Sequence, residues 1–175
     1  MVKKKLKPIP HVPLPYPLIV VAVDPGGTTG IAVFKFTEES VEYLEHHQLG
    51  DPDYVWQKIH SLVHYWQAGY NTVLVVEQFD QRPGIINPDF TPKYISRDIT
   101  NNILDVDIVW QIPGQAMNLV RPPSARHKGP DQLKRFGWYK TTNTHANDAA
   151  RHAIVYGVEK LRHMPLIRLG WPEPL

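Results

Sequence analysis

The chain contains no cysteine in 175 residues. Disulfides, thiolate-bound zinc and cysteine nucleophiles are therefore excluded. It also lacks an apolar stretch close to the about 20 residues of a membrane span, so we expect no membrane partner. The N-terminus is basic but has no long apolar segment before a small-residue cleavage site, which does not fit a secretory signal. We therefore expect a cytoplasmic protein.

Strong net charge is also lacking, since the formal value is only +2, but the charge is unevenly distributed. Between residues 115 and 140, six lysines and arginines accompany a single acid. Such a local excess favours a polyanion partner, although a solvated basic face would have the same composition. The six basic residues are Arg121, Arg126, Lys128, Lys134, Arg135 and Lys140.

No internal repeat is visible, and the length favours a single domain with one hydrophobic core. Residues 1–17 hold four lysines and five prolines, a composition that excludes a helix or a central strand. We interpret them as a semi-extended basic arm, which is either a disordered tail or a segment that touches nucleic acid. The domain itself is predicted over residues 18–162, and residues 163–175 are predicted to form a C-terminal tail.

Hydrophobic periodicity and turn residues predict an alternation of strands and helices between residues 18 and 162. Three consecutive strands are expected to form an antiparallel meander, and two further strands each follow a helix. This order predicts an α/β fold with a mixed sheet. The predicted strands are Leu18–Val23, Gly30–Phe36, Val41–Leu49, Thr72–Val76 and Val106–Ile112. The predicted helices are Asp51–Gly69, Pro92–Leu104 and His145–Arg162, and residues 113–142 are predicted to be a loop with one or two short helices.

The motif VAVDPGGTTGIAVF occupies residues 21–34. An apolar, β-branched run ends on Asp24, a glycine turn follows, and a second apolar run returns. Gly26 and Gly27 can adopt positive φ and leave room for another backbone or a phosphate. On spacing alone, Asp24 is either a turn-capping residue or part of a cation or phosphate site.

Further acids are predicted to lie near Asp24. Glu77 ends a later apolar strand just as Asp24 ends the first, and parallel neighbouring strands would bring both carboxylates to one edge of the sheet. In the motif HANDAARHA, residues 145–153, His145 and Asp148 are three residues apart and share a helix face. Small residues would let this helix lie close to the sheet: Ala146, Ala149, Ala150 and Ala153.

Clustered carboxylates repel one another unless cations lie between them. Oxygen ligands with one imidazole suit Mg²⁺ or Mn²⁺. Two such ions about 4 Å apart would activate a water and stabilise the leaving oxygen of a phosphodiester. We therefore predict a metal-binding site at this edge of the sheet. The alternative is that each acid is only a cap or a surface charge.

Other histidines are weaker candidates. His60 and His64 are four residues apart on the first predicted helix and could chelate a metal, but no third ligand accompanies them. We expect them at the surface or at its boundary. His152 shares a face with His145 but lies deeper along the helix, and we interpret it as structural.

In order and spacing, these motifs resemble those of the RuvC-like Holliday junction resolvases, within the RNase H-like nuclease superfamily. The matching residues are VAVDPGGTTGIAVF, VVEQF (75–79) and HANDAARHA, and the resemblance covers about residues 18–162. It implies an RNase H-like fold, in which three antiparallel and two parallel strands form a five-stranded sheet flanked by helices. It also implies a homodimer that cleaves four-way or otherwise branched DNA by a two-metal mechanism, with Mg²⁺ or Mn²⁺.

The resemblance also implies roles for single residues. Asp24, Glu77 and Asp148 would be catalytic metal ligands. His145, where members of the family carry aspartate or histidine, would be a fourth ligand or orient the water. Phe79 falls near the family's junction-wedging aromatic and would stack on an unpaired base, although core packing at a strand end is an equal alternative. The basic residues from 121 to 140 would bind phosphates. The short length, basic arm and proline-rich ends resemble a phage-type member, which would act in the host cytoplasm.

Three other functions compete with junction cleavage. One is cleavage of RNA or RNA–DNA hybrid by a nuclease of the same superfamily. Another is phosphate binding in an ATPase fragment, because DPGGTTG is similar to the first phosphate loop of the actin-like and sugar-kinase ATPases. Those enzymes clamp ATP between two such domains, and 175 residues supply only one. The third is a catalytically silent DNA-binding module, which the intact set of acids argues against.

Overall fold

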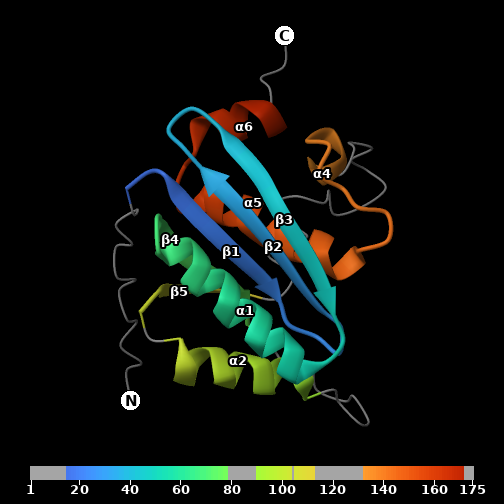
Figure 1. Cartoon of the computed structure of the whole chain (residues 1–175). Coiled ribbons are helices and arrows are strands. Elements are labelled where there is room, and N and C mark those ends of the chain that lie inside the picture. The colour runs from blue at the N-terminus through green and yellow to red at the C-terminus, as the bar shows by residue number, and fades with distance from the viewer. Residues whose placement is uncertain (1–14, 79–89, 104, 113–131, 172–175) are drawn as a thin grey trace, which may run out of the picture.

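A computed structural model describes residues 15–78, 90–103, 105–112 and 132–171. Its centre is a five-stranded sheet with the order β3-β2-β1-β4-β5 (Figure 1). The first three strands pair antiparallel, whereas β4 runs parallel to both β1 and β5. The mixed sheet predicted from the sequence is therefore confirmed. The strands are β1 (Leu18–Asp24), β2 (Thr29–Phe36), β3 (Val41–Leu49), β4 (Asn71–Glu77) and β5 (Asp107–Gln111).

Helices cover both faces of the sheet (Figure 1). On one face lie α1 (Pro52–Gln67) and α2 (Thr91–Asn102), whose buried residues share a core cluster with the strands. The other face carries α4 (Gln132–Arg135), α5 (Thr144–Glu159) and α6 (Met164–Gly170), around a second cluster. The long helix α5 crosses behind β1 and β2, and therefore covers the centre of the sheet.

Strand β1 is buried on both faces, which explains why every one of its residues before Asp24 is apolar. Because side chains alternate along a strand, its residues divide between the two cores. Leu18, Val20 and Ala22 pack in the core under α5. Ile19, Val21 and Val23 pack in the core under α1 and α2. This alternation determines on which face of the sheet the side chain at the end of each strand lies.

The ends of α1 and α5 follow local rules. The Asp51 side chain accepts a hydrogen bond of 3.0 Å from the backbone N–H of Asp53, and Pro52 occupies the first turn. Helix α5 ends at Glu159 rather than at Arg162. The reason is visible at Arg162, whose φ of 49° is left-handed and stops the helix.

Helix α6 differs from the tail that the sequence predicts over residues 163–175. Pro165 lies in the first turn of α6, where its missing N–H breaks no helical hydrogen bond. The His163 side chain caps the helix by accepting a hydrogen bond of 3.2 Å from Leu166 N–H. Leu166 itself is fully buried, so this segment belongs to the core.

The predicted basic arm lies mainly outside the described residues, which begin at residue 15. At its end, the Asn71 side-chain amide donates a hydrogen bond of 2.9 Å to the carbonyl of Pro15. Within the described ranges, none of the helices is long and apolar enough to cross a membrane.

Candidate active site

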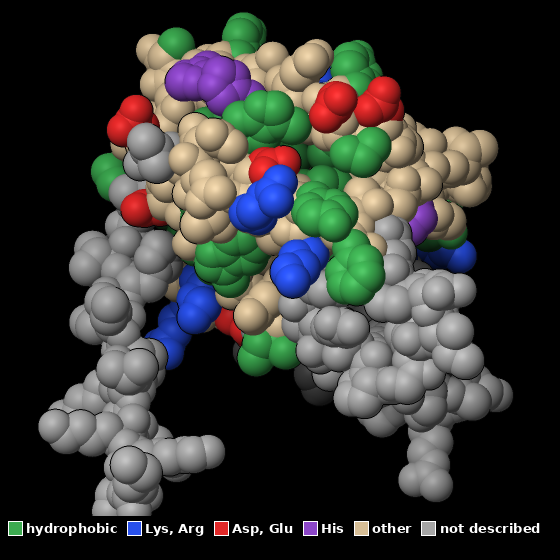
Figure 2. Space-filling model, turned by 90° about the horizontal axis from the view of Figure 1, so that it is seen from below, with side chains coloured by type: hydrophobic (Ala, Val, Ile, Leu, Met, Phe, Trp, Pro, Cys, Tyr) green, Lys and Arg blue, Asp and Glu red, His purple; other side chains and the backbone are tan. Residues whose placement is uncertain are grey.

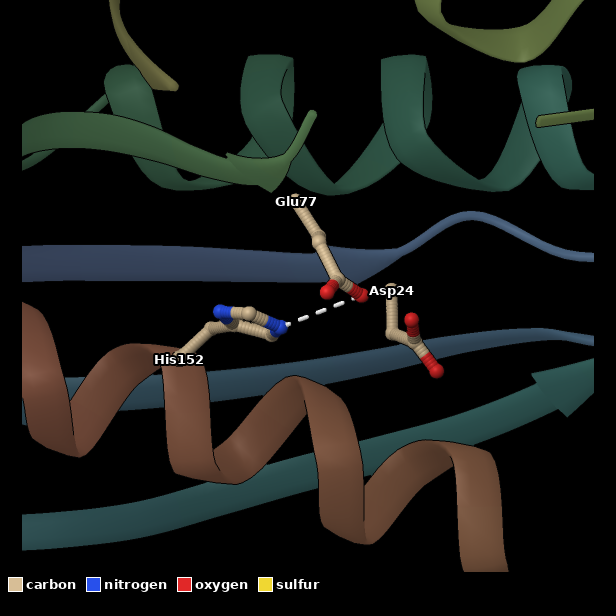
Figure 3. A group of neighbouring side chains, drawn as sticks. All are labelled: Asp24, Glu77 and His152. Carbon is tan, nitrogen blue, oxygen red and sulfur yellow. Dashed lines mark ion pairs between the residues drawn. The ribbon is translucent and has the colours of Figure 1, made fainter. Parts of the chain in front are cut away.

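Asp24 and Glu77 end adjacent parallel strands on the same face of the sheet. The pairing of β1 with β4 runs as far as Val23 and Val76, and one of these acids follows each of them. Alternation places Asp24 in the row of side chains that faces α5, and Glu77 continues the corresponding row of β4. The two carboxyls thus lie at one edge of the sheet, as the sequence predicts, and they are close enough for a hydrogen bond between them (Figure 3).

Helix α5 approaches the sheet closely enough to complete this site. At Gly30 of β2, an added Cβ would lie 1.9 Å from the backbone oxygen of His145, so only glycine fits there. The backbone N–H of His145 donates a hydrogen bond of 3.1 Å to the side chain of Gln48 on β3. The helix presses on the sheet through fully buried small residues: Ala146, Ala149, Ala150 and Ala153. His145 and Asp148 are thereby brought to the end of β1.

The site contains two groups of side chains that could each hold a metal ion, and Asp24 belongs to both. The first group joins it to His145 and Asp148, and the second joins it to Glu77 and His152. Within each group, one ligand atom from each residue lies within 4.8 Å of the others. His145 Nδ1, for example, is 3.4 Å from Asp24 Oδ2. The structure thus brings together all four predicted site residues.

Burial and the neighbouring carboxyls together act on Asp24, whose side chain is only 13% exposed. Burial, the hydrogen bond with Glu77 and the negative charges of Glu77 and Asp148 raise the pKa of Asp24 to about 9. The positive charge of Arg151 opposes this rise without cancelling it. Asp24 is therefore protonated at neutral pH in the metal-free chain, and a bound cation would favour its ionised form.

Arg151 is a buried cation within the site, and the sequence analysis assigned it no role. Its side chain is 1% exposed, and its guanidinium forms an ion pair with Asp148, three residues earlier on α5. A buried guanidinium needs such a partner, since an unpaired charge would be costly at this depth. The pair also fixes the direction in which Asp148 presents its carboxylate.

His152 belongs to the site, although we interpret it as structural from the sequence. It is 2% exposed, and its Nε2 lies 3.4 Å from Glu77 Oε2 (Figure 3). On its other side, Nδ1 lies 2.6 Å from Oε1 of Gln111, the last residue of β5. The available signal is the spacing, because His152 follows Asp148 by one helical turn and shares its face.

The predicted DNA-contacting residues are only partly described. Phe79, Arg121, Arg126 and Lys128 lie outside the described residues. Arg135 donates a hydrogen bond of 3.1 Å to the carbonyl of Gly170, and therefore ties α4 to α6. The Lys134 ammonium lies 4.8 Å from the centre of the Tyr139 ring.

Lys140 is anchored beside the start of α5. The Asn147 side chain pairs with the backbone N–H and C=O of Lys140, at 2.9 and 2.7 Å. Asn147 lies in α5, one residue before Asp148. Among the described residues of the basic cluster, Lys140 is therefore the one whose backbone is hydrogen-bonded to the helix that carries the site.

The histidine pair on α1 is separate from the two groups of potential metal ligands. His60 and His64 are exposed on α1, with their Nε2 atoms 2.9 Å apart. Among the described residues they belong to no group of three potential ligands. They therefore remain surface residues, as the sequence predicts.

The donor set of the site fits a divalent cation. It combines three carboxyls with two imidazoles, and both the burial of Asp24 and the charges of Glu77 and Asp148 raise the pKa of Asp24, so that a cation placed among them would favour its ionised form. Carboxylate oxygens with imidazole nitrogen are ligands for Mn²⁺ and related ions, and the carboxylates alone suit Mg²⁺.

Two solved structures share this architecture. The RuvC structure from Thermus thermophilus is 16% identical in sequence, with a TM-score of 0.54 over 90% of this chain and 99% of that one. The fold is that of RuvC. A second structure, T. thermophilus RuvC in complex with Holliday junction substrate, is 14% identical, with a TM-score of 0.53 and the same coverage. The RuvC fold confirms the RNase H-like architecture predicted from the sequence motifs. No protein-family model matches this sequence, and no curated protein matches it.

Proposed function

We propose that this chain is a divalent-metal-dependent endonuclease that hydrolyses phosphodiester bonds in four-way or otherwise branched DNA. The observation that carries the proposal is the convergence of Asp24, Glu77, His145 and Asp148 on one face at the end of β1. The RuvC fold supports it, because one of the similar structures holds a Holliday junction substrate. The sharing of Asp24 by two metal-sized groups favours two ions rather than one.

When bound, the ions would activate a water and stabilise the negative charge that develops on the phosphate. Asp24 would help to hold either ion, because it belongs to both groups of potential ligands. His145 is 42% exposed at the entrance of the site, where it can orient or deprotonate an incoming water. Arg151 would hold the Asp148 carboxylate in a fixed direction through their ion pair.

The proposal includes contacts between the basic cluster and DNA phosphates. Lys140 is the described residue best placed for this role, because its backbone is tied through Asn147 to the start of α5. Arg121, Arg126, Lys128, Lys134 and Arg135 complete the proposed phosphate-binding set, with Phe79 as the proposed stacking residue. Such contacts would position DNA without reading its sequence.

A homodimer is also part of the proposal, since a four-way junction needs two symmetric cuts and each chain supplies one site. The face seen from below mixes hydrophobic and charged side chains (Figure 2). On α2, Tyr94 is 52% exposed, and Arg97 forms a 3.0 Å ion pair with Asp98. Light scattering of the purified chain, alone and with junction DNA, tests whether two copies associate.

Cleavage of defined substrates tests the activity. The purified full chain is incubated with Mg²⁺ or Mn²⁺ and a labelled four-way junction, duplex, flap or RNA–DNA hybrid. We expect paired cuts in the junction and little cutting of plain duplex. Preferred cutting of the hybrid would favour an RNA-directed nuclease, and ATP hydrolysis without strand cleavage would favour the phosphate-loop alternative.

Asp24→Asn is the decisive variant, because it keeps the side-chain shape and removes the ionisable group. It should bind the junction and fail to cut it. Glu39→Gln, an exposed acid in the turn between β2 and β3, is the matched control and should cut normally. If Asp24→Asn cuts as fast as the unaltered chain, the proposed active site is wrong.

A further inference from the structure

The hydrogen bonds around His152 determine the tautomer of its ring. Gln111 donates from Nε2 to the backbone oxygen of His152 at 3.0 Å. The amide nitrogen is thereby fixed as the donor, so Oε1 is the acceptor atom that faces the ring. That oxygen is 2.6 Å from His152 Nδ1. The ring hydrogen must therefore be on Nδ1, because two acceptors cannot face each other at this distance.

In the neutral ring, this tautomer leaves an electron pair on Nε2. Nε2 lies 3.4 Å from Glu77 Oε2, so two potential metal-ligand atoms point toward the same small space (Figure 3). Asp24 borders the same space, because its carboxylate belongs to the group formed with Glu77 and His152. A cation there would be held by all three side chains. Metal-bound histidines generally donate their other ring N–H to a fixed acceptor, which is the role of Gln111 in this arrangement.

Gln111 and Glu77 lie at the ends of two neighbouring strands, β5 and β4. The two residues are register partners at the ends of β4 and β5. The backbone N–H of Gln78, next to Glu77, also donates a hydrogen bond of 2.7 Å to the carbonyl of Gln111. Gln111 is 4% exposed, so its amide is held in a packed environment rather than in solvent. The positions of Glu77 and His152 are therefore coupled through the sheet.

We propose that His152 is a metal ligand, positioned by Gln111, and that its imidazole makes the Asp24–Glu77–His152 group prefer Mn²⁺ to Mg²⁺. The preference follows from ligand type, since Mg²⁺ favours oxygen ligands, whereas nitrogen ligands bind transition-metal dications more strongly. The inference rests on the proposed function, because it assumes that the clustered carboxyls bind metal.

The competing interpretation is that His152 is an imidazolium that neutralises Glu77 without any metal. The two interpretations predict opposite effects of removing the ring. If His152 is a ligand, His152→Gln weakens Mn²⁺ binding at this group by tenfold or more. If His152 is only a counter-charge, the same substitution removes a competing cation and leaves Mn²⁺ affinity unchanged or increases it.

Calorimetric titration with Mn²⁺ and then with Mg²⁺ measures both predictions on the full chain. Gln111→Leu should weaken Mn²⁺ binding by about 10- to 100-fold, as expected when the partner of a ligating histidine is lost. Gln111→Glu keeps an acceptor for Nδ1–H and should recover much of that loss. Mg²⁺ affinity should change less than Mn²⁺ affinity in all three variants. Equal losses for both ions would overturn the proposed selectivity.

A spectroscopic test avoids altering the buried ring. Pulsed EPR of bound Mn²⁺ detects coordinated imidazole nitrogen, and exposed His60 and His145 can be replaced by glutamine without disturbing the core. In a chain carrying His60→Gln and His145→Gln, we expect nitrogen coupling to persist. Its absence, with Mn²⁺ still bound, would overturn the assignment of His152. These binding readouts are independent of strand cleavage, so a chain that binds Mn²⁺ through nitrogen but cuts no DNA would refute the proposed function alone.

Discussion

Asp24→Asn should change how the stability of the metal-free protein depends on pH. The pKa of Asp24 is about 9 in the folded chain, against an ordinary value of 3.8. Between these values the folded state keeps a proton that the unfolded state has released. The stabilisation that comes from the retained proton on Asp24 is therefore fully present in the free energy of unfolding below about pH 4, and it is lost as pH rises toward 9. The loss reaches at most about 1.4 kcal/mol per pH unit.

The asparagine variant removes this proton exchange and keeps the hydrogen-bonding shape. The stability difference between Asp24→Asn and the unaltered chain should therefore grow in favour of the variant, by at most about 2.7 kcal/mol from pH 6 to pH 8. For a chain of this size, that corresponds to a relative shift in Tm of about 5 to 10 °C. Titrating groups that do not interact with Asp24 cancel in the difference, because both proteins contain them.

Thermal unfolding followed by circular dichroism in EDTA, at pH 6, 7 and 8, measures this difference. Glu39→Gln, an exposed carboxyl at the opposite end of β2, should show none of the effect. Mn²⁺ should raise the Tm of the unaltered chain most at pH 8, where the proton on Asp24 is most easily displaced by the cation, and should raise that of Asp24→Asn far less. A stability difference that stays constant from pH 6 to pH 8 would refute the account of Asp24 given above.

Three further substitutions probe the elements that build the site. Gly30→Ala places a Cβ against the carbonyl of His145 and should cost about 3 kcal/mol or more in urea unfolding; a neutral result would mean that α5 can move away. Leu166→Ala should cost about 2 to 5 kcal/mol in the same assay, since α6 docks through this fully buried side chain. Lys140→Gln should weaken junction binding and lower the slope of log affinity against log salt by about one, with strand cleavage at saturating DNA unchanged.

Much of the fold could be predicted because the strands of this sheet follow simple rules. β1 is apolar throughout since both of its faces are covered, and its end at Asp24 is marked by the glycine turn. Glu77 could be placed beside it by the parallel order alone, and the small residues of α5 indicated a helix lying close to the sheet.

The parts that could not be predicted depend on contacts between distant segments. Nothing local distinguishes Gln111 from any other polar residue at a strand end, and its role appears only when β5 is placed next to β4. The role of His152 could not be predicted for the same reason. Its place in the helix favours burial but does not reveal which strand its side chain faces. Helix α6 was missed because residues 163–175 were predicted to form a tail, although a proline such as Pro165 is well tolerated in the first turn of a helix.

The contact between Gly30 and His145 has a consequence for anyone who wishes to redesign this protein. Because main chain meets main chain there, α5 already lies at its closest approach to β2, and repacking side chains cannot bring the helix nearer to the sheet. With the helix at this limit, the room available to a cation can still be narrowed through the length of the acids that border it, for example by Asp148→Glu. Screens for altered ion use are therefore best directed at those few acids, with the glycine turn and the first turn of α5 left unchanged.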